Sequence, residues 1–178
     1  SAVGLGGLIV GFGFIAGLLF YVAYSVFYLK DSPNLIEIFA VLSSILIAMI
    51  LGLVDDLLGW KIGLRKYQKI LLPLLIALPI MAINAGISEI TLPFVGKINL
   101  FWLYPLLIVP LGVGGGANGL KIIARYNGLE AGMGALILAS QGVMVLSMKN
   151  TFVAVMAFCM AASLLAFLIY NKYPAKIF

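Results

Sequence analysis

Residues 38–56 read IFAVLSSILIAMILGLVDD, an unbroken apolar run that ends in the adjacent carboxylates Asp55 and Asp56. As a helix rising about 1.5 Å per residue, the run from 38 to 54 nearly crosses the roughly 30 Å of hydrocarbon in a bilayer. A carboxylate pair at membrane level is costly unless a cation or a metal ion compensates its charge. The stretch therefore predicts a transmembrane helix that delivers two functional acids to one face of a membrane.

The same apolar pattern covers most of the chain. Five further runs contain no charged residue, at 1–29, 70–88, 98–120, 131–148 and 150–171. Of the 178 residues, 64% are hydrophobic and only 10% are charged, against about a quarter in a soluble domain. We therefore expect an all-α protein, a polytopic transmembrane helical bundle of about six spans, forming a single transmembrane domain over residues 1–178.

Basic residues set the expected orientation of these spans. If six spans alternate in direction, eight of the 11 Lys and Arg residues fall on one face, and the other face receives Lys30, Lys97 and Lys149. The richer face is expected to be cytoplasmic, because loops on that side carry an excess of basic residues. Three of the six acids also fall there, so this face carries the whole formal net charge of +5. Such a face either anchors to anionic lipid or binds an anionic ligand.

Two segments of the chain are rich in glycine. Six glycines crowd residues 4–17, where small residues let transmembrane helices approach closely. Residues 112–119 read GVGGGANG, and each glycine costs an α-helix about 1 kcal/mol relative to alanine. We therefore expect broken backbone there, either as a tight interhelical turn or as a loop whose free N–H groups face a ligand. In the longest outer loop, 86–99, residues 87–93 are compatible with a short strand.

The residue types around the aspartate pair point to phosphate chemistry. Mg²⁺ prefers oxygen ligands and is often held by one or two carboxylates plus substrate phosphates, and Mn²⁺ accepts similar ligands. A lysine such as Lys69 adds a positive charge for a phosphate. Together with the glycine–asparagine segment, these types predict a diphosphate site with Asp55 and Asp56 as metal ligands. The alternative is a solvated helix end whose carboxylates face Lys61 and Lys66.

Two motifs follow one another along the chain. The first joins GLVDDLLGW at 52–60 to KILLP at 69–73, and the second joins ANG at 117–119 to YNGLEAG at 126–132. In order and spacing they resemble the polyprenyl-phosphate N-acetylhexosamine-1-phosphate transferase superfamily over nearly the whole chain. The ending NGLEAG is most similar to the archaeal and eukaryotic branch, the UDP-N-acetylglucosamine–dolichyl-phosphate N-acetylglucosamine-1-phosphotransferases. MraY and the undecaprenyl-phosphate sugar-1-phosphate transferases are bacterial relatives of that branch.

The resemblance implies an enzyme at the cytoplasmic face of a membrane. It would bind a UDP-sugar and Mg²⁺ or Mn²⁺, transfer N-acetylglucosamine-1-phosphate or a related sugar-1-phosphate to a polyprenyl or dolichyl phosphate, and release UMP. The expected partners are the UDP-sugar, the polyprenyl phosphate lipid and the membrane, with no nucleic acid, and a homodimer is one expected assembly. The family's catalytic aspartate pair matches Asp55 and Asp56, and its lysine matches Lys69, with Lys66 as the rival.

The second motif supplies the substrate-binding residues that the resemblance implies. Asn118 would lie near the diphosphate and Asn127 would read the uracil edge, while Glu130 belongs to the motif without an assigned role. Lys121 and Arg125 depart from the family pattern, which has asparagine and glycine at these positions. A charged lysine cannot accept a hydrogen bond or ligate a metal, so Lys121 is expected to contact phosphate directly.

The family normally has more spans than these runs provide, and a further aspartate follows its sixth span. The 178 residues are therefore expected to be the central part of a larger enzyme and to be inactive in isolation. Two alternatives stay open. One is a non-catalytic paralogue that binds lipid phosphate or a membrane partner, because Lys121 and Arg125 alter the site. The other is a small transporter or channel in which the glycine segment lines a pore.

Overall fold

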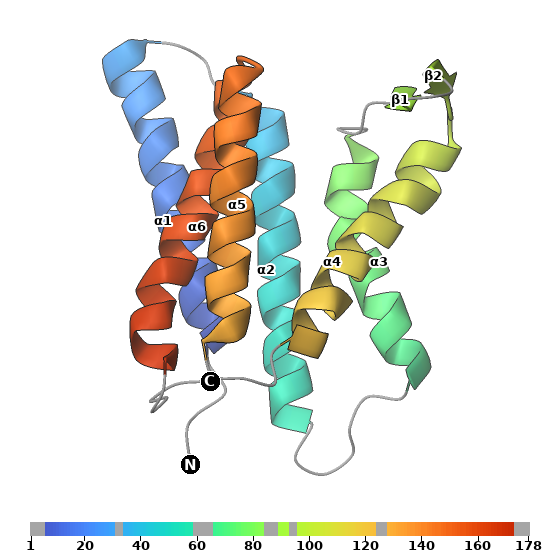
Figure 1. Ribbon diagram of the computed structural model, residues 1–178, viewed down its shortest axis with the longest axis vertical. Helices are drawn as coiled ribbons and strands as arrows, with labels where there is room; N and C mark the ends of the chain where they lie inside the picture. The colour runs from blue at the N-terminus through green and yellow to red at the C-terminus, as the bar shows by residue number, and fades with distance from the viewer. Residues whose placement is uncertain are drawn as a thin grey trace. The chain divides into compact units, whose positions relative to one another are not determined.

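The computed structural model describes residues 6–30, 34–58, 66–83, 89–92, 96–123 and 128–172. Its elements, drawn in Figure 1, are α1 (Gly6–Tyr24), the π-helix η1 (Ser25–Leu29), α2 (Leu35–Leu58), α3 (Lys66–Ala82), β1 (Glu89–Leu92), β2 (Gly96–Asn99), the π-helix η2 (Tyr104–Ile108), α4 (Val109–Ile123), α5 (Leu129–Ser147) and α6 (Thr151–Asn171). They form two compact units, unit 1 (Ser1–Leu35 and Leu120–Phe178) and unit 2 (Ile36–Gly119). The single transmembrane domain over 1–178 stays a prediction.

Four helical segments are long and apolar enough to cross a membrane: Gly6–Leu29, Leu35–Val54, Leu129–Ser147 and Thr151–Asn171. They correspond to the first, second, fifth and sixth predicted spans, and they confirm an all-α fold of the membrane type. The third and fourth predicted spans contain shorter apolar helices, Leu72–Ala82 and Tyr104–Ala117. The total of about six spans therefore stays a prediction.

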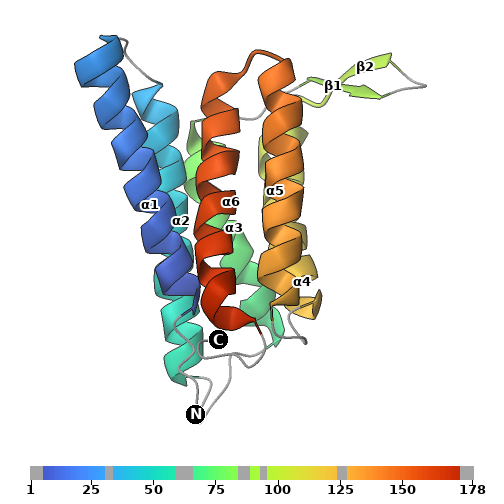
Figure 2. The ribbon, with the colours of Figure 1, turned by 60° about the vertical axis from the view of Figure 1, so that its left-hand side comes forward.

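In unit 1, α1 packs against α6 through two glycines one helical turn apart. A Cβ added at Gly13 would lie 2.9 Å from Ser163 Oγ, and one added at Gly17 would lie 3.2 Å from Cys159 Sγ. From Gly13 to Gly17 the contacting residue on α6 changes from Ser163 back to Cys159. The two helices are therefore antiparallel, as Figure 2 shows. Helices in lipid associate through close packing of this kind, because the lipid tails are as apolar as the helices. The predicted close approach in the first span is confirmed at these two positions.

The helices α5 and α6 form an antiparallel hairpin beside α1 (Figure 2). A Cβ added at Gly134 would lie 3.1 Å from Leu164 Cδ1, and one added at Gly142 would lie 2.8 Å from Phe158 Cε1. Both glycines are buried, so the two backbones meet closely along most of the hairpin. At its turn, the side chain of Asn150 accepts a hydrogen bond of 3.2 Å from the backbone N–H of Val153 and caps α6.

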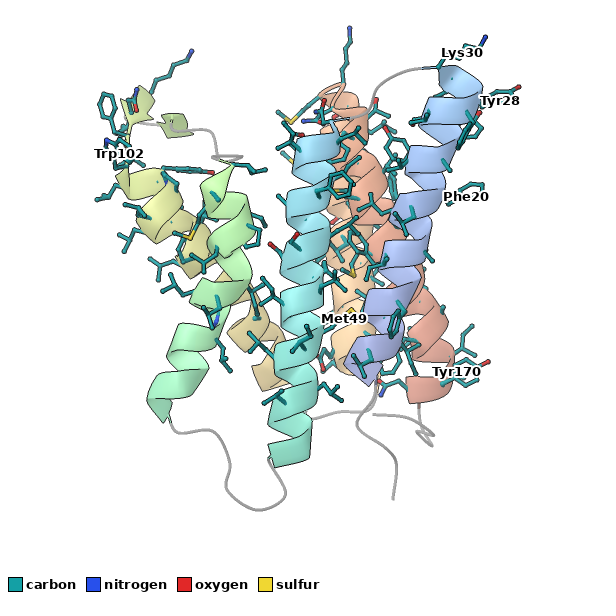
Figure 3. The ribbon with its side chains drawn as sticks, turned by 180° about the vertical axis from the view of Figure 1, so that it is seen from behind. Phe20, Tyr28, Lys30, Met49, Trp102 and Tyr170 are labelled. Atoms are coloured by element: carbon teal, nitrogen blue, oxygen red, sulfur yellow. The ribbon has the colours of Figure 1, made fainter. Side chains whose placement is uncertain are left out.

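In unit 2, α3 and α4 run in opposite directions and cross, as Figures 1 and 3 show. A Cβ added at Gly114 would lie 3.1 Å from Pro73 Cβ, and both residues are buried. In the sequence between α3 and α4, strands β1 and β2 pair antiparallel. Glu89 lies opposite Asn99 at one end of the pair, and Leu92 lies opposite Gly96 at the other. The short strand considered in the outer loop is thus confirmed over Glu89–Leu92.

The broken backbone expected for residues 112–119 is wrong, because α4 runs without a break from Val109 to Ile123. The penalty of about 1 kcal/mol per glycine was measured in water. In lipid there is no water to bind free backbone N–H and C=O groups. A segment there is therefore more stable as a helix, with its backbone hydrogen bonds formed, than as broken backbone. Gly114 also permits the close approach to Pro73. This described segment therefore forms neither a tight turn nor a ligand loop.

Replacing Gly17 by leucine should destabilise unit 1, because the longer side chain would collide with Cys159. Overpacking of this kind costs about 1–3 kcal/mol. The matched control is Gly7→Leu on the same helix, where an added Cβ meets nothing within 4 Å. Thermal unfolding in detergent should show a fall of several degrees for Gly17→Leu and almost none for Gly7→Leu. Equal falls in the two variants would contradict the packing of α1 on α6.

Candidate active site

Asp55 and Asp56 lie in the last turn of α2, which continues to Leu58. The C-terminal end of a helix carries a partial charge of about −0.5, so two acids in the last turn are electrostatically unfavourable. No basic residue lies in that turn to offset them. The last turn of α2 therefore concentrates negative charge, while Lys61, the next basic residue in the sequence, lies outside the described residues.

Lys69 lies in the first turn of α3, and Asn118 lies near the end of α4. The contact between Pro73 and Gly114 sets the register of these two helices. Lys69 precedes Pro73, and Asn118 follows Gly114, by about one helical turn of 3.6 residues. Because α3 and α4 run in opposite directions, Lys69 and Asn118 occupy the same end of the helix pair.

That end of unit 2 is also where α2 stops. In Figure 1 the C-terminal end of α2 and the N-terminal end of α3 both lie on the lower side of unit 2, while β1 and β2 lie on its upper side. Unit 2 thus carries Asp55, Asp56, Lys69 and Asn118 at one end and Lys97, in β2, at the other. The roles of the four residues stay predictions.

The remaining predicted residues belong to unit 1 or lie outside the described residues. Lys121 follows Asn118 by three positions on α4, so the two positions share one side of that helix. Glu130 is exposed in the first turn of α5, where the helix dipole favours an acid. Arg125 and Asn127 lie outside the described residues.

Asn171 is a polar residue near the second motif that the sequence patterns did not single out. It ends α6, is 8% exposed, and its side-chain oxygen accepts a hydrogen bond of 2.8 Å from the backbone N–H of Gly128. The two residues are 43 positions apart, so no helical periodicity relates them. The contact arises only because α5 and α6 fold back on one another.

Asp55 and Asp56 are adjacent carboxylate residues at the end of α2, and carboxylate oxygen is a donor type that Mg²⁺ accepts. No group of three or more His, Cys, Asp or Glu side chains is present among the residues that the structure describes. Mg²⁺ does not require such a group, since it commonly uses one or two carboxylates and takes its remaining ligands from substrate phosphates and water. Two hard oxygen donors on a helix end without an offsetting basic residue suit Mg²⁺ or Mn²⁺.

Comparison with known proteins finds relatives over nearly the whole chain. Glycosyl transferase family 4 matches residues 38–178. A Saccharolobus solfataricus protein named as a UDP-N-acetylglucosamine–dolichyl-phosphate N-acetylglucosaminephosphotransferase is 35% identical over 98% of this chain and 52% of its own length. A Bacillus subtilis protein named as an undecaprenyl-phosphate N-acetylglucosaminyl 1-phosphate transferase is 31% identical over 98% of this chain and 45% of its own length. A Clostridium botulinum phospho-N-acetylmuramoyl-pentapeptide-transferase is 31% identical over 92% of this chain and 53% of its own length.

The chain spans about half the length of these curated relatives. The match to the family begins near the start of α2 and includes every predicted site residue. Together with the long apolar helices, it makes the chain an integral membrane protein. The resemblance carried by the two sequence motifs is confirmed, and the chain belongs to Glycosyl transferase family 4.

Proposed function

We propose that this protein transfers N-acetylglucosamine-1-phosphate, or a related sugar-1-phosphate, from a UDP-sugar to a polyprenyl or dolichyl phosphate and releases UMP. The observation that carries the proposal is the acidic end of α2. The last turn of α2, which carries Asp55 and Asp56, contains no basic residue, and Lys69 and Asn118 lie at the same end of unit 2. The names of the relatives support the substrate classes, because they combine N-acetylglucosamine phosphate transfer with dolichyl or undecaprenyl phosphate.

The proposed reaction exchanges one phosphorus–oxygen bond for another. An oxygen of the polyprenyl phosphate attacks the β-phosphorus of the UDP-sugar, and a new P–O bond forms there. The bond from that phosphorus to the oxygen bridging the two phosphates breaks, and UMP leaves with that oxygen. Catalysis of such transfers depends on positioning and on electrostatic stabilisation of the phosphate oxygens.

Each proposed site residue contributes to positioning the substrates or to stabilising the charge of the phosphate oxygens. Asp55 and Asp56 would hold Mg²⁺ or Mn²⁺, which when bound supplies positive charge for the phosphate oxygens. Lys69 places a compact positive charge on a phosphate. Asn118 donates amide hydrogens to the diphosphate.

The substrate-recognition residues complete the proposed site. Asn127 reads the uracil edge, and Lys121 contacts phosphate in place of the family's asparagine. Glu130 and Arg125 flank the same segment of sequence.

We further propose that this site faces the cytoplasm and that six spans alternate across the membrane. Two observations support the orientation, one in each unit. In unit 1, the antiparallel packing of α1, α5 and α6 puts Lys30 and Lys149 at one end and Lys172 at the other. In unit 2, Lys97 and Lys69 lie at opposite ends. Both divisions agree with the alternation on which the sequence count of basic residues rests, and that count places eight of the 11 Lys and Arg residues on the side proposed to be cytoplasmic.

A second candidate is a non-catalytic member of the family that binds lipid phosphate. Lys121 and Arg125 favour it, since the family pattern has no charged residue at these two positions. Under this hypothesis, membranes containing the full protein would retain polyprenyl phosphate but release no UMP. The proposed homodimer is compatible with either function.

Asp55→Asn and Asp56→Asn should each abolish transfer, because amides cannot replace the negative charge that holds the cation. The measurement is UMP release from UDP-N-acetylglucosamine by membranes containing the full protein, polyprenyl phosphate and Mg²⁺. The matched control is Glu37→Gln, an acid in the first turn of the same helix, which should keep most of the wild-type rate. Undiminished turnover in both aspartate variants would contradict the assigned roles.

The orientation has its own test, which needs no enzymatic activity. A single cysteine at position 61, in a background lacking Cys159, should react with an impermeant maleimide only from the cytoplasmic side. A cysteine at position 149 should react only from the opposite side. Labelling of position 61 from outside would overturn the proposed topology, whatever the outcome of the transfer assay.

A further inference from the structure

Two aromatic side chains are exposed in the turn that leads from β2 towards α4. Trp102 is 80% exposed and Phe101 is 69% exposed. Figure 3 shows Trp102 at the end of unit 2 that carries β2, pointing away from α3. Aromatic side chains of this size can each bury about 150–250 Å² of surface, so leaving them in water is unfavourable. The pair therefore favours an apolar or amphipathic environment that the described part of the chain does not itself provide.

Hydrogen bonds within the turn define its conformation. Asn99 Oδ1 accepts a hydrogen bond of 3.0 Å from the backbone N–H of Phe101. The backbone N–H of Leu103 donates to the carbonyl oxygen of Leu100 at 2.8 Å. Phe101 has φ 39°, in the left-handed region that residues with a side chain adopt rarely. These bonds hold a backbone conformation that would otherwise be unfavourable, and the two rings are exposed in that conformation.

Polarity changes in one direction along the chain from β2 into α4. Lys97 and Asn99 are exposed on β2, and the two aromatic residues follow them. Three exposed leucines come next, Leu103, Leu106 and Leu107. A bilayer has the same order of layers, from charged headgroups through an interfacial region that tryptophan favours to hydrocarbon. The side chains from 97 to 107 thus match the passage of a chain from the headgroups into the membrane.

The chemistry of these side chains favours the lipid interface over a protein partner within the membrane. An indole combines an apolar ring with an N–H donor, so it suits the depth at which water and lipid carbonyls meet hydrocarbon. Lys97 adds a positive charge on the adjoining strand, and that charge complements the phosphate of a headgroup. A covering transmembrane helix would instead have to supply acceptors for both groups, because unpaired polar groups are costly in an apolar environment.

We propose that residues 99–102 form a membrane anchor, the interfacial turn, which binds the lipid headgroup region through Phe101 and Trp102 and fixes the depth of α4. Asn118 follows Trp102 by 16 positions, or about 24 Å along a helix, against about 30 Å of hydrocarbon in a bilayer. The anchor therefore holds the far end of α4 near the opposite surface of the membrane. This inference does not depend on the proposed reaction, because it concerns only how α4 lies in lipid.

The first test locates Trp102 in vesicles of phosphatidylcholine that contain the full protein. Every other tryptophan, Trp60 included, is replaced by phenylalanine, so that the fluorescence comes from Trp102 alone. The quenchers are lipids brominated near the headgroup end of their acyl chains, lipids brominated near the chain terminus, and aqueous iodide. Quenching by the shallow bromines should exceed quenching by the deep bromines and by iodide severalfold, because the interfacial turn places the indole between headgroups and hydrocarbon.

Every other pattern of quenching contradicts the proposal. Strongest quenching by the deep bromines would place the indole in hydrocarbon, and strongest quenching by iodide would place it in water. If none of the three quenchers acts on Trp102, a second copy of the chain or another transmembrane segment covers the turn. Each of these results would overturn the lipid anchor.

The second test measures the depth of α4 with a nitroxide label on a single cysteine at position 111, where Leu111 is exposed. Relative access of oxygen and of a water-soluble nickel complex to the label reports its depth. Trp102→Ala should shift this depth by several Å, and Trp102→Tyr should restore the wild-type depth, because tyrosine also favours the interface. Leu106→Ala is the matched control, since it removes an exposed apolar side chain close to the turn but no interfacial group. It should leave the depth unchanged.

Asn99→Ala tests whether the turn itself positions the ring. Without the acceptor for the N–H of Phe101, the ratio of shallow to deep quenching of Trp102 should fall about twofold. An unchanged ratio would show that the hydrogen bond does not position Trp102. An unchanged depth at position 111 in Trp102→Ala, or equal shifts in Trp102→Ala and Leu106→Ala, would overturn the role of the interfacial turn in fixing α4. Neither test uses UMP release, so their outcomes are separate from that of the proposed function.

Discussion

Close helix contact at glycine is the constraint on which the rest of this structure depends. A soluble bundle is held together largely by expelling water from its apolar faces, but helices in lipid gain nothing from that source and must fit one another closely. Gly13, Gly17 and Gly142 let α6 meet its neighbours in unit 1, and Gly114 lets α4 meet α3 in unit 2. In unit 2, the contact of Gly114 with Pro73 fixes the two helices that carry Lys69 and Asn118.

Helix bounds were predictable where apolar runs were bounded by turn-forming residues. The run 150–171 became α6, Thr151–Asn171, because Asn150 caps its start. The run 70–88 is longer than the helix that it contains, since α3 ends at Ala82. A count of charge-free residues measures what lipid tolerates, but it does not locate the residue at which the chain turns.

The sequence was enough to identify the family, while the roles of the site residues stay predictions and the conformation of one segment was predicted wrongly. The residue types alone pointed to phosphate chemistry, and the resemblance of the two motifs in order and spacing identified the family. The glycine segment at 112–119 was assigned to the wrong conformation, because helix propensities measured in water omit both the lipid and the contact of Gly114 with Pro73. Asn171 could not be singled out from the sequence for a different reason, because its hydrogen-bond partner, Gly128, lies 43 positions away.

The bond between Asn171 and Gly128 also bears on how the protein is assembled. The bond joins the start of α5 to the end of α6, at the end of the hairpin opposite its turn. Residues 128–171 are therefore connected at both ends of the hairpin, by the turn and by this hydrogen bond. Apart from the contacts of α6 with α1, the contacts of this hairpin join two helices that follow one another directly in the sequence, and contacts between near neighbours in sequence form more readily in folding. A helical hairpin of this kind can enter the bilayer as one piece, before distant helices find their partners. The start of α5 is therefore positioned by α6 within unit 1, while Asp55 and Asp56 belong to α2 in unit 2.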